Sequence, residues 1–299
     1  MQSRFFEIFR LTTYSLGLIF VCNLLFSLFY HQFVYSVVLN DRIPEELLEP
    51  ILEDQADQKI GFMETVGKLT ESIKTIEEDF KTEFKDNPQK SFESFYDIML
   101  KKKQYLLFFQ SVIWFVSFVG LGYLVLVKIL KIEITNLQED LSFKMILTGV
   151  SNGFIVFLSV MIIGIIFQAL GVDANPGVFP QKLFKELNGN SYLLAWAVYT
   201  VGIITGIVEE LFFRGFLLKS FMDKGLAQEG LMIISIIFGW LHYGPGTTVA
   251  VPFLIAFVGM YFGYLYLKTK NLWVSMACHA TYNTLGLLIA YFGVDGMTP

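Results

Sequence analysis

The sequence is poor in charged residues, and this scarcity excludes an ordinary soluble domain. Asp, Glu, Lys and Arg make up 16% of the 299 residues, whereas 54% of the residues are hydrophobic. Soluble domains carry about 25% charged residues. The composition therefore indicates an integral membrane protein. The net charge of −5 comes without any basic stripe, so we expect no nucleic-acid partner.

Proline and cysteine are also scarce. Eight Pro stand against 31 Phe and 14 Tyr, which favours lipid-facing helices over the short alternating strands of an outer-membrane barrel. The two cysteines, Cys22 and Cys278, both lie in apolar runs, so no disulfide framework is indicated. We therefore predict an all-α fold.

Long apolar runs are abundant, and seven of them have the length of a membrane span or approach it. About 20 helical residues, at about 1.5 Å each, cross about 30 Å of hydrocarbon. The fifth run is short for a span. The seven runs are Leu11 to Tyr30, Tyr105 to Ile129, Met145 to Leu170, Tyr192 to about Lys219, Leu231 to Tyr243, Val251 to Leu267 and Leu272 to Tyr291. The sequence predicts a polytopic bundle of about seven transmembrane helices.

The acidity of the chain is concentrated in one segment outside the apolar runs. Residues 41–104 hold 16 of the 27 acidic residues and 10 basic ones. Apolar residues there recur at helical spacing, at Val66, Leu69, Ile73, Ile76 and Phe80, and again at Phe92, Phe95, Tyr96 and Leu100. Asp86, Asn87 and Pro88 separate the two stripes. We predict an extramembrane helical hairpin that buries its own seam, with a docking surface for a substrate or partner as the alternative.

The runs and the acidic segment divide the chain into four regions. Residues 1–40 form an N-terminal transmembrane anchor, 41–104 the hairpin, 105–140 the second span with its connector, and 141–299 a core of five spans. The first run lacks a small-residue cleavage site, which favours an anchor over a removed signal peptide. An inside N-terminus places most lysines of the short loops in the cytoplasm, although Lys101, Lys102 and Lys103 lie at the outer mouth of the second span. We expect a multi-pass protein of a bacterial plasma membrane.

Charged residues inside the fourth run need an explanation. The stretch GIVEELFFRGF, residues 206–216, carries Glu209, Glu210 and Arg214. Each charge at the bilayer centre costs roughly 2.5 to 3.5 kcal/mol on insertion scales. Glu210 and Arg214 are four residues apart and can pair, whereas Glu209 points about 100° away around the helix. Glu209 is therefore a candidate acid–base group. The alternative is a purely structural triad that fixes helix packing.

Two of the three histidines also lie in or beside apolar runs. These are His242, in FGWLH, and His279, in HATYN. His279 and Asn283 are four residues apart, so they share a helix face and could aim two donors at a developing oxyanion. Counted from the ends of their runs, however, Glu209 and His242 lie at different depths. We therefore expect a break near Gly202 to Gly206 and a tilted or re-entrant fifth helix.

The three motifs, in this order, resemble the signature of the CPBP family of intramembrane proteases. EELFFR has the EExxxR spacing, FGWLH the FxxxH spacing and HATYN the HxxxN spacing. The family includes the type II CAAX prenyl endopeptidases and bacterial relatives associated with bacteriocin processing or immunity. The resemblance covers about Leu141 to Tyr291.

The resemblance implies an intramembrane endopeptidase acting on a membrane-associated protein or peptide. Glu209 and His242 would activate a water molecule, His279 and Asn283 would stabilise the oxyanion, and Glu210 and Arg214 would support the helix. No cofactor is required on this mechanism. Because the family is also called metalloprotease-like, a zinc site formed by Glu209, His242 and His279 is the alternative.

The same residues are also compatible with functions that involve no peptide hydrolysis. A non-catalytic member of the same fold would act as an immunity or scaffold protein that binds a peptide partner. A proton-coupled transporter would use the same polar residues as a relay, although the two halves show no internal repeat of hydropathy.

Two GxxxG pairs indicate that some helices approach one another closely. They are Gly202 with Gly206 and Gly259 with Gly263. Small residues at this spacing let helix backbones come into contact in a membrane. The pairs predict close packing within the bundle, with formation of a homodimer as the alternative.

Overall fold

The chain is described by a computed structural model over residues 2–129 and 141–293, and within these ranges it is helical. The only extended pairing in the described residues is an isolated bridge between Pro176 and Thr247. The predicted all-α fold is thus confirmed. The connector predicted to end at residue 140 falls on residues 130–140, which lie outside the described ranges.

Five helices of the described residues are long and apolar enough to cross a membrane. They are Arg4–Asn40, Leu106–Tyr123, Phe143–Ala169, Ser191–Met222 and Ala250–Thr269. Helix α13 (Ala227–Trp240) is apolar but has only 14 residues, in agreement with the short fifth run. Helix α15 (Leu272–Tyr291) has 20 residues and follows the last long helix directly. About seven spans fit this set.

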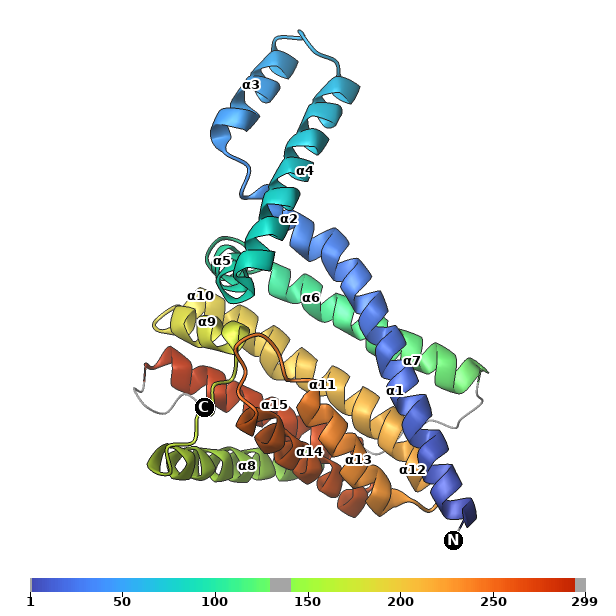
Figure 1. Ribbon diagram of the computed structural model, residues 1–299. Helices are drawn as coiled ribbons and strands as arrows, with labels where there is room; N and C mark the ends of the chain where they lie inside the picture. The colour runs from blue at the N-terminus through green and yellow to red at the C-terminus, as the bar shows by residue number, and fades with distance from the viewer. Residues whose placement is uncertain (1, 130–140, 294–299) are drawn as a thin grey trace.

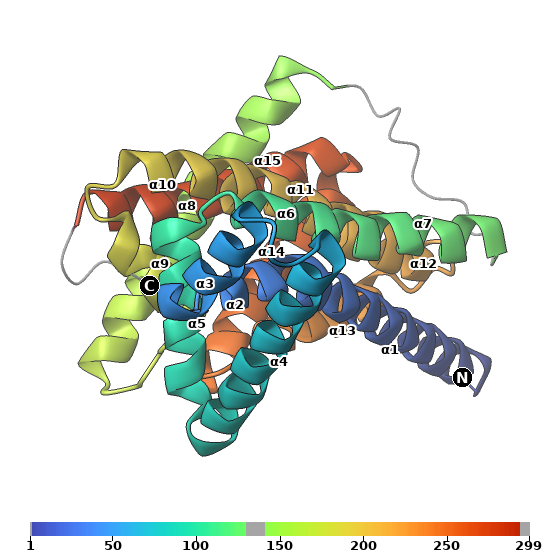
Figure 2. The same cartoon turned by 90° about the horizontal axis from the view of Figure 1, so that it is seen from above.

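The longer spans contain several consecutive helical segments. The first comprises α1 (Gln2–Tyr30), η1 (His31–Tyr35) and α2 (Ser36–Asn40). The second comprises α6 (Leu106–Trp114), η2 (Phe115–Gly120), α7 (Leu121–Tyr123) and η3 (Leu124–Ile129), and it runs beside the fourth span in both views (Figure 1 and Figure 2). The remaining long helices are α8 (Phe143–Ala169) and α14 (Ala250–Thr269).

The fourth span is one unbroken helix, so the expected break near Gly202 to Gly206 was wrong. It consists of α10 (Ser191–Ala197), η4 (Val198–Ile204), α11 (Thr205–Glu210), η5 (Leu211–Leu218) and α12 (Lys219–Met222). The backbone stays right-handed helical at each junction, and η4 and η5 are wider π-helical stretches. π-Helical turns inside α-helices are frequent at functional sites.

Glycines let the helices of the core approach closely. A Cβ at Gly206 would lie 3.1 Å from the backbone nitrogen of Ala280, and one at Gly202 would lie 2.8 Å from Oγ1 of Thr284. Both contacts are made with α15, so these glycines serve packing where a break had been expected. A Cβ at Gly263 would lie 2.5 Å from the Leu231 side chain on α13. Both GxxxG pairs therefore face neighbours in the same chain, which confirms packing within the bundle.

The acidic segment forms three helices, one more than the hairpin predicted. Helix α3 (Glu45–Ala56) was missed, whereas α4 (Phe62–Asp86) and α5 (Pro88–Lys102) match the two apolar stripes. The Asn87 side chain caps α5 by accepting a hydrogen bond from the Lys90 backbone N–H, so the chain turns where predicted. Helices α3 and α4 project away from the body of the molecule (Figure 1). Another turn, at residues 103–105, separates α5 from the second span.

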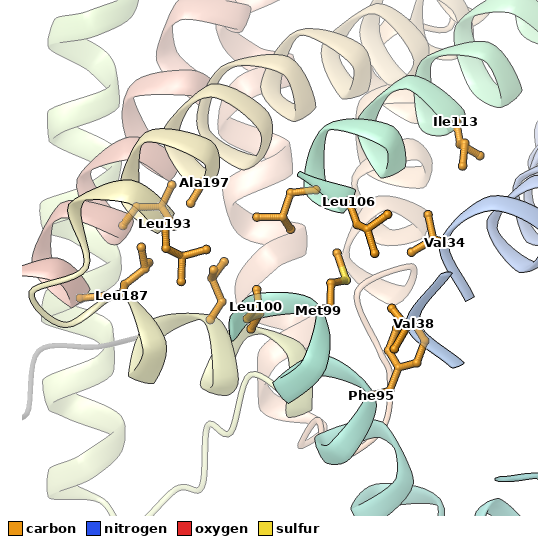
Figure 3. Packing of buried hydrophobic residues seen from close by; sticks show 14 of the residues in the cluster. Val34, Val38, Phe95, Met99, Leu100, Leu106, Ile113, Leu187, Leu193 and Ala197 are labelled. Atoms are coloured by element: carbon orange, nitrogen blue, oxygen red, sulfur yellow. The ribbon is translucent and has the colours of Figure 1, made fainter. Parts of the chain in front are cut away.

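A buried hydrophobic cluster attaches the base of this segment to the membrane helices. Helix α5 packs against α9 (Val178–Leu187) and brings Phe95, Met99 and Leu100 into contact with residues of η1, α2, α6 and α10 (Figure 3). Met99 and Leu100 are fully buried. Burying side chains of this size stabilises the fold by about 1.5 to 3 kcal/mol each. Helix α5 is therefore held against the membrane helices by buried apolar side chains.

Helix α15 lies at the centre of the core. It packs against α8, η4, α11 and α14, and α13 packs against α14 on the side of Arg214. On the α8 side, Gly149 and Gly153 allow the closest approach, because a Cβ at either position would lie within 2.6 Å of α15. The polar side chains of the fourth span and of α15 consequently face one another inside the bundle.

Candidate active site

The three charged residues of the GIVEELFFRGF stretch are buried, and two of them form an ion pair. Glu209 is 6% exposed, Glu210 is fully buried and Arg214 is 1% exposed. The Arg214 Nη1 atom donates to Oε1 of Glu210 over 2.7 Å, which confirms the pairing expected from the spacing. Glu209 does not share this ion pair. The two adjacent acids thus differ in their contacts, because only Glu210 is paired with Arg214.

Helix α15 brings His279 to both acids. The Nδ1 atom of His279 lies 3.0 Å from Oε1 of Glu210, and its Nε2 atom lies 3.8 Å from Oε2 of Glu209. Within the described residues, this contact with His279 is the one ion pair that Glu209 makes. His279 is 4% exposed and its ring stacks on Phe262 at 4.5 Å. One imidazole therefore connects the paired acid to the unpaired one.

The Arg214 side chain is satisfied by the surrounding helices as well as by Glu210. Its Nη2 atom donates to the backbone oxygen of Gly259 on α14. The guanidinium also lies over the rings of Phe238 at 4.8 Å and Phe262 at 5.6 Å. A buried charge is tolerated only with such partners. Arg214 therefore joins α14 and α13 to the fourth span.

Hydrogen bonds at Nδ1 define which ring nitrogen of each histidine carries a proton. The Nδ1 atom of His242 lies 2.8 Å from the backbone oxygen of Phe238, and a carbonyl oxygen only accepts, so Nδ1 is the donor. Oε1 of Glu210 already accepts from Arg214, so Nδ1 of His279 is likewise the donor. In the neutral rings Nε2 then carries a lone pair. His279 can donate to an oxyanion from Nε2 only as the imidazolium.

His242 lies beside this network rather than inside it. The residue follows the end of α13 and is exposed. Its ring lies 4.8 Å from the ring of Phe238, which in turn lies 6.1 Å from the ring of His279. The two histidines thus contact the same phenylalanine. Helix α13 ends at Trp240, and a turn carries His242. The tilted or re-entrant fifth helix stays a prediction.

Asn283 lies one helical turn beyond His279 on α15. Its Nδ2 atom donates to the backbone oxygen of Val201 over 3.0 Å, which uses one of the two N–H groups of the amide. In the part of the chain that the structure describes, no hydrogen bond or ion pair joins His242 or Asn283 to the two acids or to His279. The structure therefore brings four of the six predicted residues together, namely Glu209, Glu210, Arg214 and His279.

Ser275 belongs to the same network and was not predicted. It is fully buried on α15, and its hydroxyl hydrogen bonds to Oε2 of Glu210 and lies 3.1 Å from the backbone oxygen of Phe262. The signal was present in the sequence, because Ser275, His279 and Asn283 follow one another at intervals of four. A serine inside an apolar helix is common, so this spacing alone did not single it out.

The described residues do not form an evident metal site. No three side chains of His, Cys, Asp or Glu among them are grouped so that they could hold a metal ion. The residues suggested for zinc, Glu209, His242 and His279, are therefore not arranged as a ligand set in this structure. The zinc alternative stays a prediction from family resemblance, and no step below depends on it.

Comparison with known proteins supports the resemblance over the segment that contains the site. Residues 191–285 match the family model described as "Rce1-like: Type II CAAX prenyl endopeptidase Rce1-like". This segment is about a third of the chain and includes all three motifs, whereas the resemblance had been expected to begin near Leu141. No curated protein and no solved structure matches the chain. The family resemblance is thus confirmed for the fourth span and for most of the helices that follow it.

Proposed function

We propose, from the family match over residues 191–285, that this chain is an intramembrane endopeptidase that hydrolyses a peptide bond of a membrane-associated protein or peptide. The observation that carries the proposal is the pair formed by Glu209 and His279. A buried carboxylate faces an imidazole nitrogen at 3.8 Å, on two helices inside the bundle. Such a pair can accept and return a proton, which peptide hydrolysis requires.

In the proposed reaction Glu209 is the general base. It accepts a proton from a water molecule while the water oxygen forms a bond to the carbonyl carbon of the substrate. The C–N bond then breaks, and the proton moves to the leaving nitrogen, which departs as an amine. The exposed imidazole of His242 would hold the water through the lone pair on Nε2, since Nδ1 is bonded to Phe238.

His279 and Asn283 would stabilise the negative charge on the carbonyl oxygen. Asn283 retains one N–H group that is not used by Val201. His279 would take onto Nε2 the proton that Glu209 removed from the water, donate from Nε2 to the oxyanion, and give this proton up to the leaving nitrogen when the C–N bond breaks. Glu210, 3.0 Å from Nδ1, would stabilise the imidazolium. The neutral Nδ1–H tautomer of His279 is therefore the resting state of this mechanism.

The family match also defines a substrate class to test. A type II CAAX prenyl endopeptidase acts on a chain that ends in a prenylated cysteine followed by three residues. We propose a multi-pass location in a bacterial plasma membrane, and the substrate there could carry a lipid or lack one. The experiment should therefore offer both forms of one peptide.

The test uses the full chain reconstituted in liposomes. The substrates are a peptide with a farnesylated cysteine before its last three residues and the same peptide without the farnesyl group. Mass spectrometry would detect the released fragment. Glu209→Gln should abolish cleavage while the protein still folds, because the amide cannot take the proton from water. Unchanged turnover in this variant would refute the role of Glu209.

A second comparison addresses substrates that the synthetic peptides do not represent. Peptides that accumulate in a deletion strain should accumulate equally in a strain carrying Glu209→Gln. If the biological effect of the protein persists in both Glu209→Gln and His279→Ala, the chain acts by binding a partner and the peptidase proposal fails.

A further inference from the structure

Ser275 has no role in the reaction just described, although its hydroxyl lies within the polar network. The residue is fully buried between α15, α14 and the fourth span. It precedes His279 by one helical turn, so both side chains are on the face of α15 that meets Glu210. A group with no exposure to the site cannot touch substrate. Any effect on the reaction must therefore act through a neighbour.

The neighbour is the Glu210 carboxylate, whose two oxygens accept from three donors. Oε1 accepts from Arg214 at 2.7 Å and from Nδ1 of His279 at 3.0 Å. Oε2 accepts from the hydroxyl of Ser275. The terminal torsion of a glutamate is broad and roughly two-fold, so donors on both oxygens are needed to fix the carboxylate plane. Ser275 is the donor to Oε2.

The orientation of this carboxylate matters because it determines the tautomer of His279. With Oε1 facing Nδ1, the proton of the neutral ring lies on Nδ1 and the lone pair on Nε2 faces Glu209 at 3.8 Å. A carboxylate that turns away from Nδ1 no longer favours this tautomer. The ring could then hold its proton on Nε2, where it would block proton transfer from Glu209.

We propose that Ser275 is a positioning residue for peptide hydrolysis at this site. Its hydroxyl holds the Glu210 carboxylate so that His279 keeps Nδ1 protonated and presents Nε2 to Glu209. The inference rests on the proposed function for its effect on catalysis, but its effect on the tautomer does not depend on any activity.

The competing interpretation is a packing role. The Ser275 hydroxyl has one proton and two acceptors, and donation to the Phe262 oxygen at 3.1 Å would only tie α15 to α14. In that case loss of the hydroxyl would alter stability and leave the tautomer of His279 unchanged. The two interpretations therefore differ in a quantity that can be measured.

The first measurement is kinetic and uses the reconstituted full chain with the farnesylated and unmodified peptides. Ser275→Ala should lower kcat about 10-fold, in the range seen when a residue that orients a reacting group is removed, and leave KM unchanged. Ser275→Thr keeps a hydroxyl and should restore most of the rate. Ser220→Ala is the matched control, since the Ser220 hydroxyl is also buried but bonds only to the Phe216 oxygen of its own helix. This control should keep the wild-type kcat.

The second measurement is ¹⁵N NMR of the imidazole nitrogens in protein labelled at histidine. The chain has only three histidines, and the signal of His279 is identified by its loss in His279→Gln. We expect Nδ1 protonation at His279 in the wild type and in Ser220→Ala, and a substantial fraction of the Nε2-protonated form in Ser275→Ala. If Ser275→Ala does not fold, Ser275→Cys should show the same shift, because a thiol is a weak donor of similar size.

An unchanged His279 tautomer in Ser275→Ala would overturn the proposal, whatever the kinetics show. So would an unchanged kcat in a variant that cleaves. If the tautomer shifts as expected but the biological effect of the protein persists in Glu209→Gln and His279→Ala, the structural role of Ser275 stands and the peptidase function fails. The two failures are therefore distinguishable.

Discussion

His279 and Glu210 are 69 residues apart in the chain, and the imidazole Nδ1 atom lies 3.0 Å from the carboxylate. Glu210 pairs at the same time with Arg214, one turn along its own helix. The acid that the spacing assigns to helix support therefore also orients the imidazole that faces Glu209. In the proposed mechanism, structural support and acid–base chemistry share one carboxylate.

Arg214 should be essential for folding. Arg214→Met removes the cation and leaves the Glu210 carboxylate buried without its partner, which destabilises a protein by about 3 to 5 kcal/mol. Thermal denaturation in detergent would show a large fall in melting temperature. The double variant Glu210→Met with Arg214→Met should recover much of the stability, because no buried charge remains. It should stay inactive, since Nδ1 of His279 loses its acceptor. A single variant as stable as the wild type would contradict the ion-pair interpretation.

Phe238 should matter for activity as well as for stability. Its ring contacts His242 at 4.8 Å and His279 at 6.1 Å. Phe238→Leu also removes the ring that lies against the buried Arg214 guanidinium, so it should cost about 2 kcal/mol of stability. It removes the surface that aligns both imidazoles, so turnover should fall at least several-fold. Phe253→Leu, at a position that is 62% exposed on α14, is the control and should leave both quantities unchanged. Equal activity in the two variants would show that the shared ring is unimportant.

Gly206 should be needed for the close approach of α11 and α15. A Cβ there would lie 3.1 Å from a backbone nitrogen of α15, and backbone can yield only if the helices move apart. Gly206→Ala should therefore lower turnover, and Gly206→Val should lower it further, because both increase the distance from Glu209 to His279. Gly286→Ala on α15 meets nothing within 4 Å and should be neutral or stabilising by about 0.5 to 1 kcal/mol. Wild-type turnover in Gly206→Val would contradict this prediction.

Asp41 should make the attachment of the acidic segment depend on pH. Burial alone would raise its pKa, but hydrogen bonding and charge from Lys102 and Lys103 outweigh burial and hold the pKa below its ordinary value. Because the folded pKa is the lower one, the pair stabilises the protein above the unfolded pKa, and this contribution is lost as the pH falls through the folded value. The loss should be about 1 kcal/mol or less, as for other exposed ion pairs.

Limited proteolysis between pH 7 and pH 3 would measure this effect at the junction of α2 with α5. Asp41→Asn should be cleaved faster than the wild type at pH 7 and should show a weaker dependence of the cleavage rate on pH. If the cleavage rates of Asp41→Asn and the wild type depend on pH identically, the pH dependence comes from a group other than Asp41.

Metal removal separates the favoured mechanism from the zinc alternative. On the favoured mechanism, treatment with EDTA or 1,10-phenanthroline should leave peptide cleavage unchanged, because Glu209 activates the water directly. Loss of activity that added zinc restores would favour the zinc mechanism instead. Glu209→Gln would then be expected to lower zinc binding as well as turnover.

Much of the fold could be predicted because helical periodicity and apolar length are local properties. The short α13, the turn at Asn87 and the close-packing glycines all follow from the residues concerned. Helix α3 was missed because its apolar stripe of Leu47, Leu48, Ile51 and Leu52 is short and contains Pro50, which is unfavourable inside a helix. The expected break in the fourth span was wrong because glycine in a helix can serve close packing as readily as it ends a helix.

Part of the candidate site could likewise be predicted from the sequence, and part could not. Pairing of Glu210 with Arg214 depends on one helical turn, so the sequence by itself determined it. The same holds for the shared face of His279 and Asn283. Only the tertiary structure decided three further contacts. His279 contacts both acids, Ser275 hydrogen bonds to Glu210, and the Phe238 ring contacts both histidines. The rotation and depth of each helix depend on the sum of its contacts with neighbouring helices, and no local spacing contains that information.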